Sequence, residues 1–372
     1  STHCISSAAS DVYKRQAGNR SAMDSFGLFM RYMNDEYKPL PSSIIAEGID
    51  CFGVAGDRGD VAMVGYGAAR YALASGNRNE AEKLWPLIEW CLEYCHRQLN
   101  VDGVVKSDSD ELENRFPAGK ANLCTSSLYY DALISAAYLG KALKKEHKQI
   151  KSYQDRAAEL YKNIDVYFAR NVEGYDTYRY YDGNTVLRSW ICIPLTMGIY
   201  EQAKGTVEAL FSDKLWMENG LLTQSGTSTY WDRSTLYAFR GAYSCGARDI
   251  ATEYLDKYSA TRLLGDHVPY AVEAWPEGNQ RHLSTESALY CRIMTEGLFG
   301  IRPIALDAFV MTPQLPESWN MMSLKRVCAF GSIFDIEVKR DKDNKLSVLI
   351  KKDHKIVKRS KIMNGKPIEV RI

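Results

Sequence analysis

The stretch "ANLCTSSLYYDALISAAYLGKAL", residues 121–143, decides the fold class. It is small and apolar on nearly every face, whereas a helix at a protein surface keeps one polar face. Four other stretches share this composition, and they are residues 60–76, 187–203, 234–247 and 284–300. We expect all five to be helices buried on every side, with small residues that let neighbouring helices approach closely.

Amphipathic helices are predicted between these buried ones, best seen at residues 78–99 and 150–168. In the first of them the apolar side chains recur at helical spacing and form one stripe, with charged side chains opposite. Asn77 with Glu80 three residues later predicts a capping box at its start. Cys91 and Cys95 fall on the apolar stripe, so we expect them to pack as small apolar residues.

The order of elements is therefore buried helix, short turn, amphipathic helix and long loop, repeated along the chain. Repeated αα-hairpins form either a solenoid or a closed toroid. The unequal repeat lengths favour the toroid, as do the long loops rich in Asp, Glu, Arg and Trp that precede each buried helix. Loops collected at one end of a scaffold commonly carry function. We therefore predict an all-α fold, an α/α toroid whose loops surround one cavity.

The two ends of the chain differ from this pattern. "CISSAASDVYKRQ", residues 4–16, resembles translated sequencing-adapter sequence at the ends of metagenomic assemblies, so residues 1–16 are interpreted as a non-native segment. The toroid is then expected to be truncated at its N-terminus, with 17–40 as an outer helix and the targeting signal lost. We predict a catalytic domain at 17–305 and a small β-sandwich-like module at 306–372.

The β module is predicted from a change of hydrophobic period to two. "FDIEVKRD" and "KLSVLIKK" alternate around a DKDN turn, as paired strands do. "MNGKPIEV" carries the Asn-Gly signal of a tight β-hairpin.

Composition excludes several functional classes. The net charge of +1 favours neither nucleic acid nor an anionic membrane surface as a partner. No apolar run is long enough for a membrane span. The Cys and His residues lack metal-like spacing, so neither a metal nor another cofactor is predicted. The many tyrosines suit a sugar, because an aromatic face packs on C–H bonds while the hydroxyl finds a polar partner.

Two acidic clusters precede buried helices. The first is "GDRGD", with Asp57, Arg58 and Asp60. A helix cap would explain one of these carboxylates but not both together with the arginine. The second is "SDSDELENRF", with the candidate side chains Asp108, Asp110, Glu111 and Arg115. It lacks the central glycine of a calcium loop, and the alternatives left are a solvated loop and a cavity wall whose carboxyl groups have raised pKa values.

Two aromatic clusters occupy equivalent positions. "TSTYWDRST" supplies Trp231, Asp232 and Arg233, which suit a pyranose ring unless they merely start a helix. "VEAWPEGNQRHLSTESALY" places carboxylates on both sides of a tryptophan, ahead of the last buried helix. Its candidate residues are Glu273, Trp275, Glu277, His282 and Glu286, and an ordinary capped loop is the alternative.

Together these motifs resemble the six-hairpin glycosidases, and within them the bacterial α-L-rhamnosidases. "GDRGDVAMVGYGAARYA" resembles the stretch leading into that family's acid-bearing helix, and "VEAWPEG" resembles the Glu-x-Trp that carries its base. "GLFGIRPIALDAFVMTPQLPESWN" is similar to its passage into the C-terminal β-sandwich. The middle stretch, "DELENRFPAGKANLCTSSLYYDAL", is similar to debranching-type α-glucosidases of the same fold.

The resemblance implies a six-hairpin barrel and an inverting glycoside hydrolase acting on an oligosaccharide or glycoside, and it favours a periplasmic or secreted location. Glu273 would be the base, and Glu111 or Asp60 the acid, with Asp108 and Asp110 raising the pKa of the acid by repulsion. The remaining candidates would bind sugar. Two alternatives stay open: a phosphorylase of the same fold, and a carbohydrate-binding toroid without catalysis.

Overall fold

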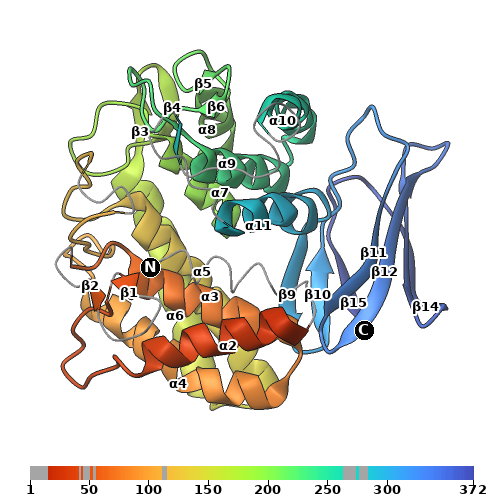
Figure 1. The fold of residues 1–372 in the computed structure, drawn as a ribbon, viewed down its shortest axis with the longest axis horizontal. Helices are drawn as coiled ribbons and strands as arrows, with labels where there is room; N and C mark the ends of the chain where they lie inside the picture. The colour runs from red at the N-terminus through yellow and green to blue at the C-terminus, as the bar shows by residue number, and fades with distance from the viewer. Residues whose placement is uncertain are drawn as a thin grey trace.

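The computed structural model describes residues 16–41, 43–44, 51–52, 56–110, 115–262, 274–275 and 284–372. The predicted adapter-like segment lies outside these residues, apart from Gln16, the first residue of a helix. Figure 1 shows the helices gathered on one side and the C-terminal strands on the other.

Five buried helical segments, called the inner helices, follow one another along the chain. They are α3 (Asp60–Ser75), α5 (Leu123–Leu143), η2 with α7 (Ser189–Cys192 and Ile193–Met197), α9 (Asp232–Ser244), and α11 with the π-helix η3 (Ser284–Arg292 and Ile293–Leu298). Every residue of α3 is buried, as its composition predicts. Each inner helix packs against the next in chain order (Figure 1).

The outer helices are amphipathic and cover this inner row. They are α2 (Gln16–Met30), α4 (Arg78–Arg97), α6 (His147–Phe168), α8 (Ala203–Leu210) and α10 (Arg248–Arg262). α4 packs on α3, α6 on α5 and α10 on α9, so these three form αα-hairpins with the inner helix that each follows. The predicted alternation of buried and amphipathic helices is confirmed for the described part of the chain. The full six-hairpin toroid stays a prediction.

Two predicted helices are wrong in extent. The outer helix predicted at 17–40 ends at Met30. Residues 187–203 contain only the short η2 and α7 segments, because Gly198 ends α7 with a left-handed φ of 88°. The capping box is half right: the Asn77 side chain accepts from the backbone N–H groups of Asn79 and Glu80, but Glu80 accepts from the Tyr71 hydroxyl instead of reaching back.

The strands after Ile301 form two sheets. The first has the order β15-β10-β9, and the second the order β11-β12-β13-β14. The strand bounds are β9 Ile301–Ala305, β10 Ala308–Met311, β11 Met321–Ala329, β12 Ser332–Arg340, β13 Leu346–Lys352, β14 Lys355–Ile362 and β15 Ile368–Arg371. The Phe309 ring stacks with the rings of Phe330 and Phe334 between the sheets.

The predicted pairing around the DKDN turn is confirmed, since β12 and β13 are antiparallel. The predicted Asn-Gly hairpin is wrong, because β14 pairs with β13 whereas β15 pairs with β10. The Asn364 side chain instead bonds the backbone N–H and carbonyl of Leu315, which turns the chain from one sheet to the other.

The β module packs on the C-terminal ends of the inner helices. The backbone N–H groups of Phe330 and Gly331 donate to the carbonyls of Ala74 and Ser75, at 2.6 and 3.1 Å. Gly76 ends α3 at φ 70°, and a Cβ there would run into the backbone of Phe330 and Gly331. Glycine is therefore required twice at this junction, for its conformation and for its size.

We expect Gly76→Ala to lower the free energy of unfolding by more than Gly246→Ala. Both glycines follow an inner helix at positive φ, but a Cβ at Gly246 meets nothing within 4 Å. Each variant loses roughly 1–2 kcal/mol for the left-handed conformation, and overpacking adds about 1–3 kcal/mol at Gly76 only. Denaturant unfolding of both variants measures this, and equal losses would contradict the close packing of α3 on the β module.

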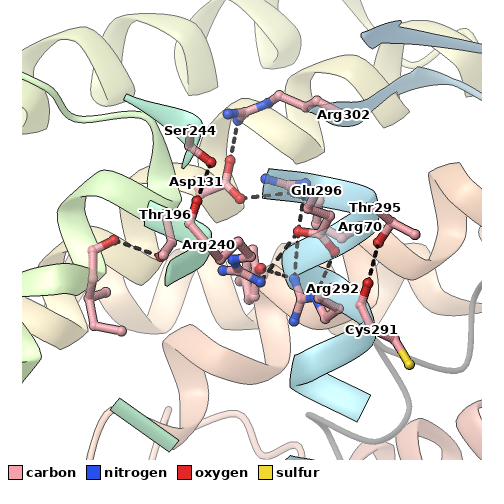
Figure 2. A network of polar contacts seen from close by, with 12 residues as sticks. Arg70, Asp131, Thr196, Arg240, Ser244, Cys291, Arg292, Thr295, Glu296 and Arg302 are labelled. Carbon is pink, nitrogen blue, oxygen red and sulfur yellow. Dashed lines mark hydrogen bonds and ion pairs between the residues drawn. The ribbon is translucent and has the colours of Figure 1, made fainter. Parts of the chain in front are cut away.

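A buried ionic network joins the inner helices (Figure 2). Glu296 of η3 accepts from Arg292 at 2.6 and 2.9 Å and from Arg240 of α9 at 3.3 Å, and lies 3.7 Å from Arg70 of α3. Arg292 also donates to the Tyr66 hydroxyl of α3 at 2.6 Å. The last inner helix is thus connected to the first.

The same network includes α5 and β9. Asp131 of α5 is fully buried and accepts from Arg70 at 3.0 Å and from Arg302 of β9 (Figure 2). The β module is therefore attached to the helices by a charged pair as well as by the backbone bonds at Gly76.

Glu296 should make stability depend on pH in the acid range. Burial opposes its ionisation, but Arg292, Arg240 and Arg70 outweigh burial and lower its pKa from 4.5 to about 2. Because the folded-state pKa is depressed, the stabilisation is present above pH ~4.5 and lost as pH falls toward 2. It amounts to about 3 kcal/mol.

We expect Glu296→Gln to lower the free energy of unfolding at pH 7 by about this amount and to flatten its decline below pH 5. Unfolding curves from pH 7 to pH 3 measure both. Glu208→Gln, on an exposed part of α8, should leave the profile unchanged. An unchanged profile for Glu296→Gln would contradict the network.

Candidate active site

The loops that precede the inner helices lie together at one end of the helical region, here called the mouth. Backbone bonds connect each loop to the next. The connected pairs are Asp57 with Asp108, Asn122 with Tyr181, Arg188 with Gln224, Leu222 with Tyr230, and Tyr230 with Trp275. The prediction that these loops share one face is confirmed for their described parts.

The first acidic cluster is held in a glycine turn. Gly59 is the N-cap of α3 at φ 92°, and α3 has no side-chain cap. Asp57 instead accepts from the Gly59 N–H at 2.9 Å, and its own N–H donates to the Asp108 carboxylate at 2.8 Å. Burial raises the pKa of Asp57, and the Asp108 charge raises it further against the opposing Gly59 bond. Burial therefore favours the protonated form of the Asp57 carboxyl group.

Asp60 has a different environment. It is buried at the first position of α3, and its Oδ2 lies 3.5 Å from Nε of Arg58, which is also buried. Asp57 bonds backbone N–H groups at the start of α3, so helix capping accounts for part of its environment. Asp57 and Asp60 both lie within the mouth.

The second acidic cluster is joined to the third inner helix. Asp110 Oδ2 lies 3.2 Å from Nη2 of Arg188, and both side chains are buried. Arg188 also donates to the Pro117 carbonyl at 3.0 Å and lies over the Tyr180 ring at 4.7 Å. Arg115 is exposed in the same loop. Glu111 lies outside the described residues.

Three buried aromatic rings, here called the aromatic wall, pack together at the starts of two inner helices, beside the loops of the mouth. The Trp231 ring meets the Trp190 ring edge-on at 4.5 Å, and Trp190 meets Tyr237 at 5.5 Å. Trp231 is only 2% exposed, so its predicted stacking on a sugar stays a prediction. Asp232 is paired with Arg262 at 3.0 Å, and Arg233 lies over Trp231 at 5.8 Å.

The Glu-x-Trp stretch adjoins this wall. β7 (Tyr230–Trp231) and β8 (Ala274–Trp275) are antiparallel, with Tyr230 opposite Trp275. For Trp275 and Glu286 only the backbone is described, and Glu273, Glu277 and His282 lie outside the described residues. The roles proposed for these side chains therefore stay predictions.

Arg188, Trp190, Tyr237 and Arg262 were missed from the sequence. Arg188 and Trp190 had a usable signal, because they stand at the start of a buried helix just as Asp57–Asp60 and Trp231–Arg233 do. Nε of Arg188 and Nε1 of Trp190 are buried with no hydrogen-bond partner in the described part of the chain. Buried donors are nearly always paired, so these two could bind a polar ligand.

Among the described residues, no group of three or more His, Cys, Asp or Glu side chains is placed to hold a metal ion. Nor is any helix in this part of the chain both long and apolar enough to cross a membrane.

Comparison with known proteins identifies the fold. No family model and no curated protein matches the sequence. Among solved structures, a sialidase superposes on 88% of this chain with a TM-score of 0.65 and 13% identity. An α-L-rhamnosidase from Dictyoglumus thermophilum superposes on 94% with a TM-score of 0.61 and 14% identity. The neutral trehalase of Saccharomyces cerevisiae superposes on 79% with a TM-score of 0.54 and 11% identity.

This chain spans 34% of the sialidase's length, 39% of the rhamnosidase's and 70% of the trehalase's. The fold of the chain is six-hairpin glycosidase-like.

Proposed function

We propose, on the premise of this six-hairpin glycosidase-like fold, that the chain is a glycoside hydrolase whose active site is the mouth. The observation that carries the proposal is the composition of the mouth: buried carboxylates on two adjoining loops, beside a buried cluster of tryptophan and tyrosine rings. Cleavage of a glycosidic bond needs two carboxyl groups on opposite sides of the bond. Aromatic walls and paired charges suit a sugar ring and its hydroxyl groups.

The mechanism that we propose is inversion. A carboxylic acid, Asp60 or Glu111, protonates the leaving oxygen, while Glu273 accepts a proton from the attacking water. Inverting enzymes hold the two carboxyl groups roughly 6.5–9.5 Å apart, which leaves room for that water. Arg58, Arg188 and Arg233, with the nearby Asp57 and Asp232, then orient the sugar or position the catalytic groups.

The neighbouring charges favour hydrolysis over phosphorolysis. A phosphorylase needs cations free to receive phosphate beside the base. Arg58 and Arg188 are each paired with a buried carboxylate, Asp60 and Asp110, which offsets their charge. We prefer α-L-rhamnosides as the substrate class. The Glu-x-Trp resemblance and the rhamnosidases of similar fold support this choice.

A panel of aryl glycosides tests the proposal, with an α-L-rhamnoside among an α-glucoside, an α-mannoside and a β-galactoside. We expect release of the aryl group and free sugar from at least one glycoside, without added phosphate. Formation of a sugar 1-phosphate only when phosphate is present would replace hydrolysis by phosphorolysis. Sugar binding without any turnover would instead support a carbohydrate-binding toroid without catalysis.

A further inference from the structure

A cavity lies at the opposite end of the inner helices from the mouth. It has a volume of about 490 Å³ and is called here the basal pocket. Its wall is formed by the ends of α9 and η3, by β9, and by the 364–367 turn before β15. α9 starts at Asp232 in the mouth and ends at Ser244 in the pocket wall. At about 1.5 Å per residue, the two sites lie roughly 20 Å apart.

The basal pocket has a surplus of positive charge. One carboxylate lines it, Glu296, whereas the cations that line it are Arg70, Arg240, Arg248, Arg302 and Lys366. Behind the wall, Asp131 pairs with Arg70 and Arg302, and Asp249 lies 3.7 Å from Arg248. Cations therefore outnumber the carboxylates that they contact.

Arg240 is incompletely paired. It is 2% exposed, and only its Nη1 reaches a carboxylate, Glu296 at 3.3 Å. Its Nε and Nη2 are buried without a hydrogen-bond partner among the described residues, and so is Nε of Arg248. Figure 2 shows Arg240 beside Glu296, whose oxygens already accept from Arg292. Nε and Nη2 of Arg240 thus reach no carboxylate among the described residues, and the guanidinium lies over the Tyr237 ring at 4.8 Å.

The electrostatics of a neighbouring group agree with this surplus. Burial alone would raise the pKa of Tyr66, yet Arg292, Arg240 and Arg70 together lower it below its ordinary value. The arginines thus keep a positive field in the protein interior even with Glu296 present.

We propose that the basal pocket binds a phosphate group. A guanidinium presents parallel N–H donors that match phosphate oxygens. A dianion offsets more of the surplus charge than a monocarboxylate does. Asn364 in the wall has a second amide hydrogen beyond the one that it donates to the Leu315 carbonyl, and this hydrogen can be a further donor. The volume leaves room for the small organic part of a phosphate ester.

Calorimetric titration of the intact chain tests the proposal at constant ionic strength. The probes are inorganic phosphate, a hexose 6-phosphate, the unphosphorylated hexose and acetate. We expect one phosphate-group site per chain, at least tenfold tighter than acetate. The relative affinities of phosphate and ester then show whether the natural ligand is free phosphate or an ester. Phosphate binding no tighter than acetate binding would overturn the proposal.

Variants locate the site. Arg240→Met should weaken phosphate binding at least tenfold, while Glu296 keeps Arg292 and Arg70 as partners. Lys366→Met removes an exposed cation of the pocket wall without touching the core, so it should weaken binding even if Arg240→Met fails to fold. Lys355→Met, an equally exposed lysine outside the pocket, is the matched control. Equal affinities for Lys366→Met and Lys355→Met would contradict the site.

Discussion

Glu273→Gln should lower kcat by about 10²–10⁴-fold with little change in KM. A general base acts on the water only in the transition state, so its loss does not affect binding of the ground state. Glutamine keeps the shape and hydrogen bonding of the side chain but cannot accept the proton. Steady-state kinetics on the preferred aryl glycoside measure both constants.

Glu277→Gln is the matched control, because it lies on the other side of Trp275. It should lose less activity if it only positions the sugar. Azide added to Glu273→Ala should restore part of the turnover, since a small anion can take the place of the base. A kcat near the wild-type value in Glu273→Gln would refute the assignment, and a large loss confined to Glu277→Gln would move the base there.

Asp60→Asn should lower kcat/KM by about 10²–10⁴-fold on a glycoside with a poor leaving group if Asp60 is the general acid. The kcat/KM for a dinitrophenyl glycoside should change little, because so acidic a leaving group needs no protonation. Asp60 lies at the first position of α3, 3.5 Å from Nε of Arg58. Kinetics on the two substrates measure it.

Glu111→Gln on the same two substrates decides between the candidate acids. Leaving-group dependence in Glu111→Gln alone would assign the acid to Glu111. Equal losses on both substrates in Asp60→Asn would make Asp60 a binding or positioning residue. Asp102→Asn, an exposed residue of the neighbouring turn, controls for nonspecific loss, and thermal unfolding detects destabilisation from the lost ion pair with Arg58.

The buried helices could be predicted because their apolar composition indicates that they are buried. A helix apolar on every face has to be buried, and α3 and α5 begin at or within two residues of the predicted starts. Gly198 was harder to interpret, since an isolated glycine is compatible with a helix until its backbone conformation is known. The Asn-Gly turn failed for a related reason: local turn chemistry fixes the bend but not which strands pair.

The mouth could be predicted as a set of loops but not as a set of contacts. Asp110 pairs with Arg188, 78 residues away, and Asp232 with Arg262, 30 residues away. Such partners are chosen by the packing of whole helices, and no spacing rule along one chain reveals them. Sequence patterns therefore located the charged loops. The structure showed that burial raises the pKa of Asp57 and that Asp60 lies beside the cation of Arg58.

The central claim, an inverting glycosidase site in the mouth, is tested most directly by proton NMR of the sugar formed during the first minutes of hydrolysis. The anomeric signal reports the configuration before mutarotation equilibrates it. The proposed site predicts that the first product has the anomeric configuration opposite to that of the substrate, and that Glu273→Gln slows its formation by about 10²–10⁴-fold. A first product with retained configuration would contradict the account.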